Sequence, residues 1–195
     1  IAKELNKRGI FQGKILIPGE AFQSKKSAYP LNIANVCNSL YDRKMIDSKG
    51  RDNLYKRMSE VTQENPYPDE VIGYAVDVLD QYFSLIIEIA ETVPDWRSGF
   101  ILQNNGFNVF LRVLNEILKF KKGNWNKHEV KKLIKEPVKL YFEEHFEEIK
   151  ETRISTSNEA GRGKVALDIM KCINQKNENF ARDFIKEAEK RERIE

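Results

Sequence analysis

The segment Ser155-Thr-Ser-Asn-Glu-Ala-Gly-Arg-Gly-Lys164 combines features that suit an anion. Its two glycines allow a close approach to the backbone, and its two cations stand where a predicted helix begins and backbone N–H groups are available. It is not a Walker A loop, because Asn158 stands where the first glycine is required and Val165 replaces the final Ser or Thr. A capped helix start, with Thr156 or Ser157 as the cap, is the alternative interpretation. The residues predicted to contact a phosphate or another anion are Ser155, Ser157, Gly161, Arg162, Gly163 and Lys164.

A second candidate site is basic. Residues 119–135 contain seven lysines around Trp125, and helical spacing places three of them on one face. Such a row can follow the phosphate backbone of a nucleic acid. The alternative is a solvated helix face with Trp125 packed into the core, because no established nucleic-acid-binding motif accompanies the lysines. The residues predicted to contact nucleic acid are Lys121, Lys122, Lys127, Lys131 and Lys135, together with Arg43 and Lys44 from a second basic stretch.

The sequence offers little for catalysis. The histidines, His128 and His145, lie too far apart for an HExxH zinc motif, and neither has the partners of a serine triad. We expect His128 at the surface and His145 among solvated glutamates. Cys37 and Cys172 each fall on an apolar helical stripe, which predicts buried cysteines. We therefore predict no catalytic residue, no metal and no cofactor, and whether the complete protein is an enzyme stays open.

The composition is that of a soluble protein. Of the 195 residues, 41% are hydrophobic and 32% charged, and no apolar run approaches the ~20 residues needed to cross a bilayer. With two cysteines, a reducing cytoplasm is the expected location. The net charge of +3 is unevenly distributed, since residues 61–118 carry −7 and residues 119–195 carry +4. Separate acidic and basic regions leave room for a polyanionic partner.

Apolar periodicity predicts a mainly α fold. The strongest signal runs from Asp69 to Thr92, where a narrow polar stripe interrupts an otherwise apolar helix, and we expect this helix at the centre of the core. A second core helix follows over 107–118. Asn126 and Glu129 have the spacing of a capping box for a short helix, and Pro137 is expected at the first position of the next one.

We predict one helical domain over 1–195, with about seven helices. A short extended segment lies near the N-terminus, over Ile10–Gly19, and a long exposed connection spans 42–68. Because the chain opens at Ile1 with its first methionine at Met45, we expect it to be an internal or C-terminal piece of a longer protein.

Three groups of residues, in this order, resemble the C-terminal half of DGQHR-domain proteins, which include DndB-like proteins of bacterial DNA-modification islands. The Asp-Gly-Gln-His-Arg signature itself does not occur in the chain. The residues that carry the resemblance are Gly9–Ile17 with Pro30–Leu40, then Tyr82-Phe83, Val93–Trp96 and Asn105–Phe107, and finally Ser155–Lys164.

The resemblance implies a non-catalytic helical module that contributes DNA or partner-protein contacts in DNA modification or anti-phage defence, as a regulator, including of transcription, or as an accessory factor. The implied partners are DNA, the N-terminal half of the same protein and other modification-system proteins, with no membrane. Two alternatives remain: half of a nucleotide-binding enzyme that uses Ser155–Lys164 for phosphate, and a structural oligomerisation scaffold.

Overall fold

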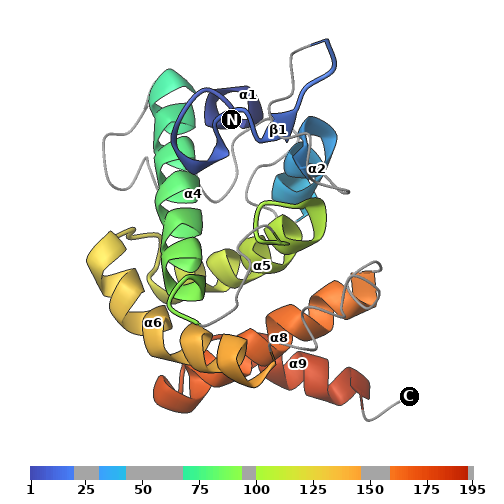
Figure 1. Cartoon of the computed structure of the whole chain (residues 1–195). Helices are drawn as coiled ribbons and strands as arrows, with labels where there is room; N and C mark the ends of the chain where they lie inside the picture. Colours follow the sequence, from blue (N-terminus) through green and yellow to red (C-terminus); the bar gives the residue numbers. More distant parts are fainter. Residues whose placement is uncertain (20–30, 43–67, 94–99, 146–158, 193–195) are drawn as a thin grey trace.

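The computed structural model describes residues 1–19, 31–42, 68–93, 100–145 and 159–192. In these ranges the chain is mainly helical, with seven α-helices and one two-stranded parallel sheet near the N-terminus. The predicted fold class is therefore confirmed. Figure 1 shows the long helix α4 at one side of the molecule, with the N-terminal elements beside its first half and α6 near its C-terminal end.

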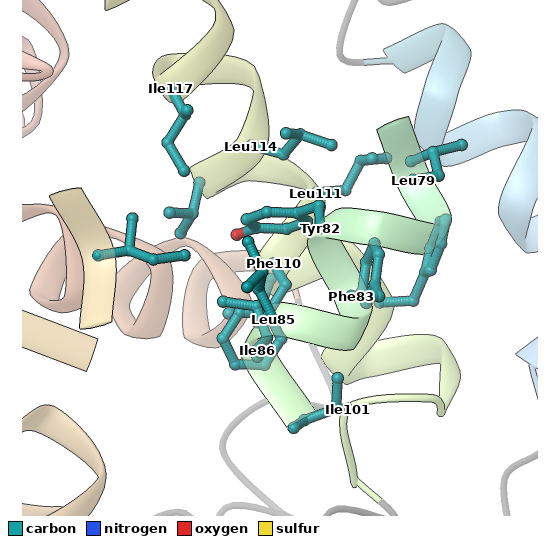
Figure 2. Packing of buried hydrophobic residues seen from close by; sticks show 14 of the residues in the cluster. Leu79, Tyr82, Phe83, Leu85, Ile86, Ile101, Phe110, Leu111, Leu114 and Ile117 are labelled. Carbon is teal, nitrogen blue, oxygen red and sulfur yellow. The ribbon is translucent and has the colours of Figure 1, made fainter. Parts of the chain in front are cut away.

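Helix α4 spans Pro68–Ala90 and supplies many of the buried residues of the core, as its sequence predicts. Asp77 and Glu88 are exposed on the narrow polar stripe, while the residues between these positions are mostly buried. Tyr82 and Phe83 are fully buried, and both lie in the cluster of apolar side chains between α4 and α5 (Figure 2). A helix that is apolar around most of its circumference needs partners on several sides. The surrounding helices supply them.

Helix α5 spans Asn104–Phe120 and packs against α4, α2 and α8. Phe107 stacks on Phe83 of α4, with ring centroids 5.0 Å apart, and Phe11 meets Phe83 edge to face at 5.3 Å. These three aromatic rings join the N-terminal segment to the two core helices.

The N-terminal elements are short. They comprise α1 (Ala2–Leu5), a 3₁₀ turn η1 (Gly9–Phe11), β1 (Ile15–Leu16), β2 (Leu31–Asn32) and α2 (Ile33–Asp42). Strands β1 and β2 are parallel, with Ile15 opposite Leu31. The extended segment predicted over Ile10–Gly19 is thus correct for Ile15–Leu16, but its first residues form the 3₁₀ turn.

Helix α6 spans Lys127–Glu144 without interruption. The prediction that Pro137 begins a separate helix was wrong, because Pro137 lies inside α6 and is buried. Proline removes one backbone hydrogen bond from a helix but has a φ that the helix accepts. The buried face continues across it, from Val130 and Ile134 to Val138 and Phe142, so packing compensates for the lost bond.

The C-terminal helices α8 (Glu159–Lys176) and α9 (Arg182–Glu192) complete the described chain. Helix α8 packs on both α5 and α6, and α9 packs on α8. The exposed connection predicted over 42–68 lies outside the described residues except for its two ends, Asp42 in α2 and Pro68 in α4.

Candidate nucleic-acid interface

Helix α6 positions the predicted basic face. Its N-cap is Asn126, whose Oδ1 accepts a hydrogen bond from the backbone N–H of Glu129 at 3.1 Å, as the capping-box spacing predicts. Because residues four apart share a helix face, Lys127, Lys131 and Lys135 form a row, called the lysine row below.

The lysine row lies beside the acidic residue Glu88 of α4. Lys131 Nζ forms an ion pair with Glu88 Oε1 that links the two helices. The hydrogen bond from Lys131 is the main cause that lowers the pKa of Glu88; burial opposes it, and the charges of Lys131, Lys127 and Lys135 lower the pKa further. All three lysines therefore act on one carboxylate. The four formal charges leave a local excess of +2, on a surface where Glu88 and Lys131 are 54% and 36% exposed.

Lys121 and Lys122 lie at the end of α5, near the start of α6. Lys121 Nζ is 2.8 Å from Glu129 Oε2, and this hydrogen bond lowers the pKa of Glu129. Lys122 is exposed, has a φ of 50° and, among the described residues, has no ion pair. Together with Gly123 it ends α5 in left-handed geometry, which turns the chain toward α6.

Trp125 packs against the core, as the alternative interpretation of this stretch predicts. Its Nε1 donates to Gln81 Oε1 of α4 at 2.9 Å, and its ring meets Tyr82 edge to face with centroids 6.4 Å apart. The tryptophan thus fixes the connection between α5 and α6 against α4. That anchoring holds the start of the lysine row in place.

The predicted anion-binding segment, Ser155–Lys164, is only partly described. Ser155 and Ser157, like Arg43 and Lys44 of the basic prediction, lie outside the described residues. The prediction of a loop was wrong for Gly161, Arg162, Gly163 and Lys164, because these residues belong to α8. Gly161 and Gly163 have helical geometry. Glycine in a helix costs about 1 kcal/mol relative to alanine, and the packing of α8 on α5 and α6 outweighs this cost.

The two cations of this segment have different surroundings. Arg162 Nη1 donates to Asn105 Oδ1 of α5 at 3.2 Å, which ties the start of α8 to α5. Gly163 faces Arg112 of α5, whose Nη1 would lie 3.2 Å from a Cβ at this position. Lys164 is exposed. Arg162 thus links the start of α8 to α5, while the predicted caps Thr156 and Ser157 lie outside the described residues.

A buried polar ladder on α5 was missed by the sequence analysis. Asn108 Nδ2 donates to Ser39 Oγ of α2 at 3.0 Å, and Arg112 Nε donates to Asn108 Oδ1 at 3.2 Å. Glu116, one turn further, is 7% exposed and accepts from Lys119 at 2.6 Å. The four-residue spacing of Asn108, Arg112 and Glu116 was the available signal, but on an isolated helix it resembles a solvent-facing stripe.

The histidines and cysteines give no reactive arrangement. His128 is exposed, as predicted, and His145 stacks near Tyr141 with ring centroids 4.7 Å apart. The prediction that Cys37 is buried was wrong: Ser39 and Leu40 occupy the buried side of α2, and Cys37 is exposed. Cys172 is half-buried; burial, and then Glu144 and Asp168, raise the pKa of its thiol, which disfavours a nucleophilic thiolate.

The described ranges offer neither a metal centre nor a membrane-spanning helix. They contain no group of three or more His, Cys, Asp or Glu side chains arranged to hold a metal. No helix within them has the length and hydrophobicity needed to cross a membrane.

Comparisons with protein-family models, curated proteins and solved structures found no significant match. The geometry of the described residues is therefore the basis for a functional proposal.

Proposed function

We propose that this chain is a non-catalytic helical module of a DGQHR-type protein of DNA modification or anti-phage defence, and that it binds the phosphate backbone of DNA through the lysine row of α6. The observation that carries the proposal is the row of Lys127, Lys131 and Lys135 on one face of α6, with the outer two exposed and the middle one paired with Glu88 of α4. The DGQHR assignment rests on the resemblance described above.

The spacing of the lysine row suits a phosphate backbone. Residues four apart rise about 6 Å along an α-helix, so Lys127 and Lys135 are separated by about 12 Å of helix axis. One DNA strand rises about 3.4 Å of duplex axis per phosphate while it also winds around that axis, so a straight row of this length reaches about two to three phosphates. Lys127 and Lys135 are exposed and, within the described ranges, have no ion pair. Their ammonium groups can therefore meet phosphates without first breaking a protein contact.

This contact is expected to be independent of DNA sequence. Lysines bind phosphates as flexible point charges, whereas base recognition needs directed hydrogen bonds in a groove. The lysine row offers only ammonium groups, so the module supplies affinity and position. Any sequence preference of the complete protein would come from other parts of it.

Titration of a fluorescently labelled duplex with the full chain, at two salt concentrations, tests the proposal. We expect binding at low salt that weakens as salt increases, because each phosphate contact releases a condensed counterion. No binding at low salt, or binding that does not respond to salt, would contradict it.

A further inference from the structure

Glu88 of α4 pairs with the middle lysine of the lysine row, which suggests that this carboxylate limits how strongly the row binds DNA. This inference rests on the proposed function. Glu88 comes from α4, the buried central helix, so its position is set by the core rather than by α6. Its carboxylate takes the place beside Lys131 that a phosphate oxygen would take. The middle lysine of the row is thus already paired, while the outer two are not paired within the described ranges.

We propose that Glu88 is an internal counter-anion that a DNA phosphate must displace from Lys131, so that this carboxylate limits both the affinity for DNA and the salt dependence of binding.

The consequence for affinity follows from simple electrostatics. A phosphate that approaches Lys131 meets the negative charge of Glu88 at a distance of a few ångströms. Removing a unit charge about 4 Å away, in surroundings close to water, changes affinity by about fivefold. Glu88→Gln keeps the shape and the polarity of the side chain but removes its charge, so it should strengthen DNA binding by about that factor at low salt.

The salt dependence gives a sharper test. When an unpaired lysine binds a phosphate, the DNA releases a counterion, and the slope of log K against log salt becomes steeper by about 0.9. When Lys131 leaves Glu88 for a phosphate, the freed carboxylate attracts a cation from solution, and the two effects largely cancel. Lys131 should therefore add little to the slope while Glu88 is charged, but about 0.9 once Glu88 is neutral.

The experiment is a double-mutant cycle in the full chain, read by titration of the same labelled duplex over a series of salt concentrations. The variants are Glu88→Gln, Lys131→Gln and the double variant. Glu136→Gln is the matched control, because Glu136 is an exposed carboxylate on α6 itself and has no ion pair among the described residues. Circular dichroism and thermal melting verify that each variant is folded.

We expect Glu88→Gln to bind about fivefold more tightly than the wild-type chain and to steepen the slope by about 0.9. Glu136→Gln should change affinity less than Glu88→Gln does and leave the slope unchanged, because among the described residues no lysine of the row has to leave Glu136 to bind a phosphate. Lys131→Gln should flatten the slope only in the Glu88→Gln background. Equal effects of Glu88→Gln and Glu136→Gln, or an equal slope change from Lys131→Gln in both backgrounds, would overturn the inference.

The outcome also separates this inference from the proposed function. Wild-type binding that is salt-dependent but unaffected by Glu88→Gln supports the DNA contact and rejects the role of Glu88. Binding that becomes measurable only in Glu88→Gln supports the counter-anion. Absence of binding in every variant at low salt rejects both proposals.

Discussion

Lys131 of α6 and Glu88 of α4 form an ion pair that joins the lysine row to the buried central helix. The pair has two consequences. It holds the basic face at a fixed place on the core, and it puts one negative charge among three positive ones. The structural role of the pair and its proposed role in binding can be tested separately. A pH titration of Glu88 tests the first, and titrations with DNA test the second.

The ion pair predicts a pH effect at Glu88. Its pKa lies below the ordinary value for glutamate, first because of the hydrogen bond from Lys131. A carboxylate whose pKa is lower in the folded state stabilises the fold above its unfolded pKa, and this stabilisation is lost as pH falls through the folded pKa. In Lys131→Gln the Glu88 pKa should rise toward the ordinary value. A carboxyl NMR titration of both proteins measures this shift, and identical titration curves would contradict the ion pair in solution.

The turn at Gly9 is predicted to require glycine. Gly9 has a φ of +64°, and an added Cβ would lie 1.9 Å from Asp80 Oδ1, which accepts the N–H of Ile10 at 2.9 Å. Gly9→Ala should reduce the free energy of unfolding by about 2 to 4 kcal/mol, through left-handed strain and loss of that hydrogen bond. Gly19→Ala is the control, since Gly19 has a φ of +82° with open space around it. Urea unfolding should show a clearly smaller loss for Gly19→Ala, and equal losses would refute the close contact with Asp80.

The buried hydroxyl of Tyr82 is predicted to destabilise the core. Among the described residues it has no hydrogen-bond partner, and burial raises the pKa of the phenol well above its ordinary value. Tyr82→Phe removes the unsatisfied polar group and keeps the ring, so it should raise the free energy of unfolding by about 1 kcal/mol. Thermal and urea unfolding measure the change. A loss of stability in Tyr82→Phe would show that the hydroxyl forms a favourable contact.

The N-cap of α6 is predicted to contribute to the stability of the basic face. Asn126→Ala removes the acceptor of the Glu129 N–H and should cost about 1 kcal/mol. Asn124→Ala is the control, because Asn124 is exposed two residues earlier and outside the helix. Comparable unfolding midpoints for the two variants would be incompatible with the observed cap.

The sequence was sufficient to predict the core helices, because their signals are local. The polar positions of α4 recur every three or four residues, and its burial follows from that pattern alone. A local signal also gave the wrong prediction at Pro137, because proline is common at the first position of a helix. The apolar face from Val130 to Phe142 runs across the proline without a shift in phase, and burial of that face decides the outcome.

Two features of the candidate sites depend on contacts between distant segments and could not be predicted. Arg112 is polar on an exposed-looking stripe, yet it is buried because α2 and α8 cover that side of α5. Likewise, the lysine row is visible from its four-residue spacing, but nothing local indicates that Glu88, 43 residues earlier, pairs with Lys131. Such relationships are set by helix packing.

The most direct test of the proposed function compares two triple variants of the full chain in duplex-DNA titrations over a series of salt concentrations. One replaces Lys127, Lys131 and Lys135 by Gln. The control replaces Lys3, Lys7 and Lys14, three exposed lysines of the N-terminal segment, which lies beside the other half of α4 (Figure 1). Both variants lose the same charge. We predict that the first flattens the slope of log K against log salt by roughly 2, while the control changes it by less than about 0.5. Equal slopes in the two variants would contradict a DNA contact at the lysine row.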